Sequence, residues 1–375
     1  MGRYAGRLVV ETHAHAQRAA VGFKERGIKP SHGQMYAEVS QTTWYDNSER
    51  LLFDMERYGV DVCVIMSGGL ARGSDNDLDL KLAEKYPDKF VALCYPTTFL
   101  RRVAEGKEKW SVEGAVREVE ERLKTGKYKG IGQELPVSET GAFGKLWATG
   151  EARKKEKKVS YDELLDRYRM FLDLASKYKV GVAGAPKDIS FLSPLAAEYP
   201  DVPLLVQLVG MGPDATTHQI QTYCEVIQRS KNVYLEMGTA PAELIEVALS
   251  DPNVGPTQIT HGTDWGASHY IYSQPGRPIH GERFTTYVDF IPKWGAVRYQ
   301  TDWWGWSLHQ IDRLRNTLTQ DEINLILGGN AARIFKLDVP YTRLFPEGRP
   351  DLWGVDVDKY SPFIPQEQIK KKHRR

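Results

Sequence analysis

The chain has 375 residues, 41% hydrophobic and 26% charged, which is typical of a water-soluble globular protein. Its 50 Lys and Arg residues balance 49 Asp and Glu residues, so a formal net charge of +1 favours neither nucleic acid nor an anionic membrane as a partner. No apolar run approaches the roughly 18 residues of a membrane span, and the polar start MGRYAGR does not resemble a signal peptide. We therefore expect a cytoplasmic protein.

Short apolar runs alternate along the chain with segments of helical period. The runs are continuous rather than alternating with polar residues, as in parallel strands that are buried on both faces. They span residues 7–13, 60–66, 90–96, 129–135, 180–185, 203–209, 232–237 and 257–264. Capping-box patterns at Ser160–Glu163 and Thr319–Glu322 predict two of the helix starts. Eight strand–helix units predict an α/β fold, a (β/α)8 or TIM barrel, over residues 1–338.

Three segments do not fit this alternation of strands and helices. Residues 136–158 form a Gly-rich, charged insertion after the fourth strand, and residues 265–304 form a long aromatic-rich loop after the eighth. Residues 339–375 have no period and carry several aromatic residues and prolines. We expect this C-terminal extension to pack as an arm on the barrel or on a partner subunit, and we expect a homo-oligomer such as a homodimer.

The first strand ends in VVETHAHA, with His13 and His15 separated by one residue. Residues i and i+2 of a strand point to the same side, so both imidazoles could hold a metal ion. The alternative is a pair of surface histidines at a strand end. In a (β/α)8 barrel the carboxyl ends of the strands form the working face, which favours the metal site.

The other predicted strand ends contribute further polar side chains to this face. The fourth strand ends in Gln133 and Glu134, and the eighth leads to Asp264. His13, His15, Glu134 and Asp264 together suit a divalent metal, with zinc expected and manganese possible as the alternative ion. Such an ion makes bound water acidic or polarises a substrate oxygen. Glu134 could instead pair with a lysine of the insertion.

Proton transfer needs a titratable group at the same face. Asp264, in THGTDWG, lies between the last strand and a Trp-Gly turn, where an acid seldom serves packing. His218 and His261 are the candidate imidazoles for this role. His218 could equally be a surface residue, and His261 could be a core residue that points away from Asp264.

A small carboxylated substrate is the expected ligand. Trp265 and Tyr270 of the long loop would contact a flat ring, and Arg277 would bind a carboxylate with two hydrogen bonds. Gln207, at the end of the sixth strand, would add a hydrogen-bonding amide. Alternatively, these rings cover the barrel or a subunit interface.

Several motifs resemble the amidohydrolase superfamily, in particular amidohydrolase family 2, the aminocarboxymuconate-semialdehyde decarboxylase-like group. They are the HAH of the first strand, THGTDWG, LILGGNAARIFKL, NDLDLKLAEKYPDKFVAL and YPDVPLLVQL, and the similarity covers roughly residues 7–338. The resemblance implies a metal-dependent decarboxylase, hydratase or hydrolase of small carboxylated compounds. It also implies that His13 and His15 bind the metal, that Asp264 ligates it or transfers a proton, and that NAARIF packs the last helix on the barrel.

The chain departs from that family where histidines are expected at the ends of the fifth and sixth strands. Ala183 and Gly184 take the first place, and Gln207 or Leu208 takes the second. A glutamine cannot shuttle a proton as an imidazole does. Three interpretations remain: a rearranged metal site in a decarboxylase, a metal-independent hydrolase of lactonase type, and a non-catalytic support subunit. We favour them in that order.

Overall fold

The structure is a computed structural model that describes residues 8–16, 48–67, 76–104, 106–139, 159–211, 216–265 and 303–337. Most of the expected insertion and nearly all of the loop after the eighth strand lie outside these ranges, as does the C-terminal extension. In the described part, no helix has both the length and the apolar character needed to cross a membrane.

The described part contains eight short strands, one at each of the eight predicted runs, and the first strand extends one residue past its run to Ala14. They form two parallel sheets, β1-β2-β3 and β4-β5-β6-β7-β8, in which each strand pairs with its neighbour in sequence. Their bounds are β1 Val10–Ala14, β2 Val62–Ile65, β3 Phe90–Ala92, β4 Gly130–Ile131, β5 Gly181–Ala183, β6 Leu204–Val206, β7 Val233–Glu236 and β8 Ile259–Thr260.

Backbone hydrogen bonds also join the two sheets at both of their seams. A parallel bridge links Cys94 to Ile131 next to β3 and β4, and another links Ala14 to Trp265 next to β1 and β8. At the second seam, the Trp265 N–H donates to His13 O at 3.0 Å. The ladders do not form one closed sheet, but eight parallel strands in sequence order with bridges at both seams are consistent with the predicted (β/α)8 barrel.

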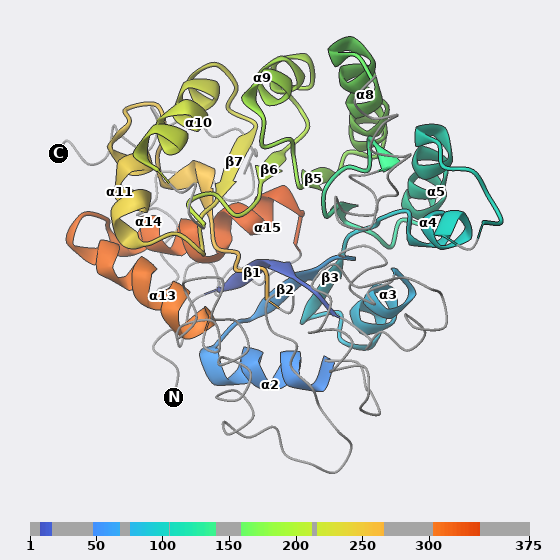
Figure 1. Cartoon of the computed structure of the whole chain (residues 1–375). Coiled ribbons are helices and arrows are strands. Elements are labelled where there is room, and N and C mark those ends of the chain that lie inside the picture. Colours follow the sequence, from blue (N-terminus) through green and yellow to red (C-terminus); the bar gives the residue numbers. More distant parts are fainter. Residues whose placement is uncertain are drawn as a thin grey trace, which may run out of the picture.

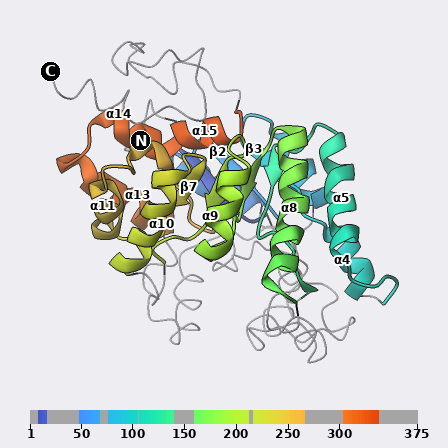
Figure 2. The same cartoon turned by 90° about the horizontal axis from the view of Figure 1, so that it is seen from above.

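Helices follow the strands and lie outside them, as Figures 1 and 2 show for α8 to α11. Ser160 caps α8 by accepting from Glu163 N, and Thr319 and Glu322 form the predicted capping box of α14. The helices after β1 to β4 are α2 Ser48–Tyr58, α3 Asn76–Lys85, α4 Thr97–Ala104, α5 Val112–Lys124 and α8 Tyr161–Tyr178. Those after β5 to β8 are α9 Ile189–Glu198, α10 Thr217–Arg229, α11 Ala242–Ser250, α13 Trp303–Arg313, α14 Gln320–Asn324 and α15 Asn330–Ile334.

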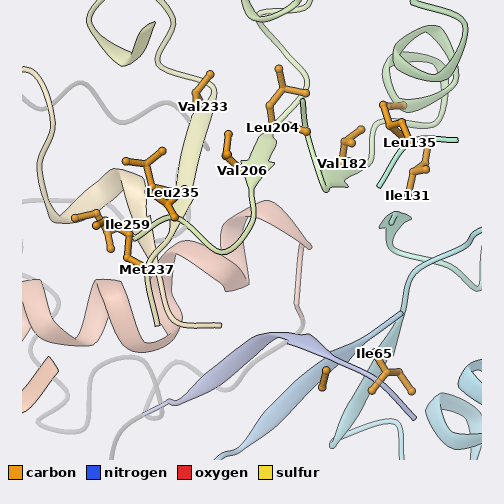
Figure 3. Close-up of a cluster of buried hydrophobic side chains, with 14 of the residues drawn as sticks. Ile65, Ile131, Leu135, Val182, Leu204, Val206, Val233, Leu235, Met237 and Ile259 are labelled. Carbon is orange, nitrogen blue, oxygen red and sulfur yellow. The ribbon is translucent and has the colours of Figure 1, made fainter. Parts of the chain in front are cut away.

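Alternate residues of the strands enter two different hydrophobic clusters. One cluster lies between the strands and the helices, and Figure 3 shows part of it. The other, which we call the inner cluster, takes Val10 and Val64 from the first sheet and Leu205 and Tyr234 from the second. Because the inner cluster draws on both sheets, the strands enclose a common interior.

Helix α15, the last helix of the described part, closes this interior at one end, between the two groups of strands (Figure 1). Ile334 and Phe335 belong to the inner cluster, and Asn330 Nδ2 donates to Ile259 O at 2.7 Å. A Cβ atom at Gly181 would lie only 3.0 Å from Ile334 Cγ2, so β5 begins with a residue that leaves room for the helix. The NAARIF segment therefore packs on the strands, as the resemblance implied.

Candidate functional site

A bulge in β1 sets the direction of the two histidines. The pairing of β1 with β2 shifts register between Glu11 and Ala14. As a result, the neighbouring residues Thr12 and His13 both hydrogen-bond to Glu236, which a regular strand does not allow because adjacent side chains point to opposite faces.

His13, His15 and Asp264 form one compact group at the carboxyl ends of β1 and β8. The Nε2 atoms of His13 and His15 lie 3.2 Å and 2.8 Å from Asp264 Oδ1. The two rings meet edge to face with their centroids 5.0 Å apart. Asp264 has a φ of 57°, a left-handed conformation that Asp adopts more readily than most residues. The structure thus brings together three of the four predicted metal ligands.

The Nδ1 atoms of both rings face hydrogen-bond acceptors. His13 Nδ1 lies 2.9 Å from Glu236 Oε1, and His15 Nδ1 lies 2.8 Å from Met66 O. Because both partners can only accept, each Nδ1 must carry a hydrogen. In a neutral ring Nε2 then has a lone pair, and both lone pairs point toward Asp264 Oδ1. Such a contact between two lone pairs and a carboxylate is stable only with a cation or an added proton between them.

Two buried carboxylates stand behind this group. Glu236, at the end of β7, accepts from Thr12 Oγ1 at 3.1 Å and from Leu208 N at 3.2 Å, in addition to His13. Glu11 accepts from Thr263 N at 2.8 Å and from Trp304 Nε1 at 2.5 Å. In the described part of the chain, no Lys or Arg pairs with either carboxylate. Their negative charge favours a cation at the adjacent group.

Electrostatics around His13 agree with this picture. Burial opposes its protonation, but the charges of Glu236 and Asp264 outweigh burial and raise the pKa of His13 above its usual value. Burial and the charge of Glu236 raise the pKa of Glu11 to about 7, against the hydrogen bonds from Thr263 and Trp304. The group therefore attracts positive charge, whether a proton or a metal ion.

Gly262 of THGTDWG makes room for the carboxylate of Glu236. An added Cβ at this position would collide with Thr12 Oγ1 and would lie 2.6 Å from Glu236 Cδ. A side chain here would thus displace the residue that orients His13. This packing gives a physical reason for a glycine between His261 and Thr263.

The remaining predicted ligand and proton-transfer residues lie apart from the three-residue group. Glu134 is exposed, and it is not part of the group of potential ligands that the described residues form. His218 is exposed in the first turn of α10. His261 is fully buried; its Nδ1 lies 3.3 Å from Val10 O, and its Nε2 has no hydrogen-bond partner among the described residues. Burial lowers the pKa of His261 to about 4, so the ring is neutral at pH 7.

The predicted substrate residues are only partly described. Gln207 is buried, and its Nε2 lies 3.2 Å from Met66 Sδ. Trp265 is also buried; its indole N–H donates to Asp54 Oδ2 at 3.2 Å, and its ring stacks on Trp304. These contacts place Trp265 in the packing of α2 and α13 rather than at an opening. Tyr270 and Arg277 lie outside the described residues.

Three further residues of the site, Glu236, Glu11 and Gln133, have no predicted role in the sequence. Glu236 could have been recognised as a candidate site residue, because it is an acid inside the apolar run NVYLEM, which a glycine follows. Glu11 lies inside β1 and Gln133 lies two residues after β4, near the predicted ligands His13 and Glu134. Gln133 is half-buried, and its Nε2 lies 3.3 Å from His13 Nε2, where the amide can donate to the lone pair of the ring.

The donor set of this group fits a divalent cation. His13 Nε2, His15 Nε2 and an oxygen of Asp264 lie within 4.8 Å of one another. Imidazole nitrogen and carboxylate oxygen are the ligands that zinc uses at catalytic sites, where three protein ligands leave one position for water or substrate. Each histidine already has an acceptor on its other nitrogen, as metal-bound histidines almost always do.

No family model and no curated protein matches the sequence. A probable 2-pyrone-4,6-dicarboxylic acid hydrolase from Acinetobacter baumannii, solved with citric acid bound, aligns with a TM-score of 0.45 and 13% identity over 88% of this chain and 99% of its own. Amidohydrolase 2 from Bifidobacterium longum subsp. infantis aligns with a TM-score of 0.44 and 11% identity over 88% of this chain and 100% of its own. Likeness at this level assigns no chemistry to the chain.

Proposed function

We propose that the chain is a metal-dependent lyase or hydrolase of amidohydrolase type, in which His13, His15 and Asp264 hold a divalent cation, zinc or manganese. One observation carries this proposal: two imidazole lone pairs and one carboxylate converge at the carboxyl ends of β1 and β8, and the Nδ1 atom of each ring is already satisfied. When bound, the cation would polarise a substrate oxygen or lower the pKa of a water molecule.

The chain's own residues supply binding and proton transfer. Gln133 places an amide next to His13 and can hydrogen-bond a substrate oxygen there. Asp264 lies within reach of the same space and is the one predicted proton-transfer residue in the group. A small cyclic or aromatic carboxylate is the proposed substrate, and decarboxylation is the favoured reaction: the bond to the carboxyl carbon breaks, carbon dioxide leaves, and the ring carbon takes a proton.

The first test is metal content. Protein purified without chelator should contain about one equivalent of zinc or manganese, and the His13→Ala/His15→Ala double variant should lose it without losing helical content. His309→Ala is a matched control, because His309 is exposed on α13 away from the group and should leave the metal content unchanged. No metal in the wild-type protein, even after reconstitution with zinc and manganese, would contradict the proposal.

The second test is the reaction. Small aromatic and cyclic carboxylic acids should release carbon dioxide in the presence of the metal-loaded protein, and Asp264→Asn should reduce the rate by at least about 100-fold, as removal of a general acid or base does. Hydrolysis of lactones without carbon dioxide release would instead favour hydrolase chemistry at the same site. Full activity of His13→Ala with an accepted substrate would contradict the assignment of this group.

A metal-independent hydrolase is the second candidate. The raised pKa of His13 beside Glu236 and Asp264 favours it, because a protonated imidazole in contact with a carboxylate is also an acid–base pair. In that case hydrolytic activity would persist in the presence of a strong chelator. Loss of all activity on chelation, with recovery on adding zinc or manganese, would exclude this candidate.

A further inference from the structure

Glu236 joins three strands through one buried carboxylate. It lies at the end of β7 with no exposed surface. Its Oε1 accepts from His13 Nδ1 of β1 at 2.9 Å and from Leu208 N, just after β6, at 3.2 Å. Its Oε2 accepts from Thr12 Oγ1 at 3.1 Å. Because donors from three directions converge on it, the carboxylate has a single orientation.

This orientation determines which nitrogen of His13 carries the hydrogen. Oε1 can only accept, so the hydrogen of a neutral ring resides on Nδ1. Nε2 is then the lone-pair atom, and it faces Asp264 Oδ1 and the Gln133 amide. The opposite tautomer would place two lone pairs against each other at Glu236 and two hydrogens against each other at Gln133.

The two proposed ligand histidines differ in the hydrogen-bond acceptor that each Nδ1 atom faces. His15 Nδ1 faces the neutral carbonyl of Met66, whereas His13 Nδ1 faces the charged carboxylate of Glu236. An anionic acceptor on one ring nitrogen makes the other nitrogen a stronger electron-pair donor than a neutral acceptor does. The site is therefore asymmetric, with His13 as its stronger ligand.

We propose that Glu236 is the positioning residue of this site: it holds His13 in the Nδ1–H tautomer and strengthens Nε2 as a ligand. The proposal rests on the proposed metal-dependent function for its effect on affinity, but its effect on the tautomer does not require a metal. Glu236 does not touch the substrate or the cation; it acts through His13 alone.

The tautomer can be measured directly in the wild-type protein. Long-range 1H–15N NMR spectra of metal-free protein labelled at imidazole nitrogens, recorded over a pH series that reaches the neutral form of the ring, should show neutral His13 with its hydrogen on Nδ1. The His13→Gln spectrum identifies its signals by their absence. A hydrogen on Nε2, or rapid exchange between both tautomers, would overturn the proposal whether or not the protein binds metal.

Glu236→Gln tests the effect on affinity. The amide keeps the size of the side chain, and its oxygen keeps the bonds to His13 and Leu208, so the variant removes mainly the charge. Titration with zinc in a competing chelator should show a 10- to 100-fold weaker affinity, the range in which orienting partners of metal ligands act. An affinity within threefold of wild type would overturn the proposal and leave the metal site itself in place.

Glu118→Gln is a matched control for the general cost of neutralising a buried carboxylate. Glu118 is buried on α5 and accepts from Thr98 N at 3.1 Å and from Arg122, away from the proposed site. It should lower stability without changing zinc affinity. An equal loss of affinity in Glu118→Gln and Glu236→Gln would show that destabilisation, not positioning, is the cause, and would also overturn the proposal.

Discussion

His261 differs from His13 and His15 in what surrounds its ring. It is fully buried, with Nδ1 at 3.3 Å from Val10 O, and it lies three residues before Asp264. Asp264 lies against each ring of the proposed site, whereas the hydrogen-bond partner of His261 among the described residues is a backbone carbonyl, Val10 O. Burial therefore lowers the pKa of His261 to about 4, while the neighbouring carboxylates raise the pKa of His13.

This difference predicts a pH dependence of stability. Unfolding returns His261 from a pKa of about 4 to its usual 6.5, so below pH 6.5 the unfolded chain binds more protons than the folded one. The resulting stability is present above pH 6.5 and is lost as the pH falls toward 4, by up to roughly 3 kcal/mol. His261→Asn keeps a donor for Val10 O but cannot titrate.

Urea denaturation between pH 4 and pH 8 measures this contribution. The free energy of unfolding should fall less steeply with acidification in His261→Asn than in the wild type. His309→Asn, which replaces an exposed histidine of α13, should keep the wild-type slope. The same acid sensitivity in His261→Asn and the wild type would show that His261 is not held neutral by burial.

At the scale of single residues, sequence patterns predicted the polar, metal-binding types of side chain that follow the ends of apolar strands. The spacing of His13 and His15 and the acid at 264 were visible because each interrupts an apolar or turn pattern. The partners of the rings were not, because Glu236 lies 223 positions away from His13 and Met66 contributes only its backbone oxygen. Such partners depend on the fold rather than on local pattern.

Glu11 connects separate elements and makes the structure of β1 depend on α13. It accepts from His13 N of its own strand, from Thr263 after β8, and from Trp304 of α13. At Oε2 it meets Trp304 Nε1, which can only donate. A Gln side chain places its NH2 group either against the indole N–H of Trp304 or, when flipped, against the backbone N–H groups of His13 and Thr263, so two donors meet in a buried position in both orientations.

We therefore expect Glu11→Gln to destabilise the protein at pH 8 by about 1–3 kcal/mol, the cost of a buried donor without an acceptor. Chemical denaturation followed by circular dichroism measures the change. Glu163→Gln, an exposed replacement on α8, should have an effect within about 0.5 kcal/mol. A Glu11→Gln variant as stable as the wild type would show that the network does not hold the elements together.

Elements were predictable in kind and order but not in length. The capping patterns at Ser160 and Thr319 gave the starts of α8 and α14, because caps are local chemistry. The apolar runs are longer than the strands, since many residues beyond the ladders, such as Leu93 and Cys94 after β3, are buried without belonging to a strand. The helix that the Thr319–Glu322 pattern starts gives way to a π-helical segment, Leu325–Gly329, where a Cβ at Gly328 would collide with Leu8 O.

At the scale of the whole molecule, the inner cluster decides whether the two sheets behave as one unit. Backbone hydrogen bonds join the sheets at both seams, and side chains from both sheets pack together in the inner cluster between them. Phe335, directly after α15, is among the largest fully buried side chains and packs in this cluster with residues of both sheets. The count of strand–helix units predicted the barrel, but the closing role of Phe335 required the contacts.

Phe335→Ala should lower the free energy of unfolding by about 3–5 kcal/mol, as removal of a buried aromatic ring does. Because the ring supports a shared interior, hydrogen exchange should accelerate in β2 and in β6 together, although these strands belong to different sheets. Phe53→Ala is the matched control, since Phe53 is 50% exposed on α2. Faster exchange in only one sheet would mean that the two sheets unfold separately. Because His13 belongs to one sheet and Glu236 to the other, the proposed site would then lose its geometry whenever either sheet opened.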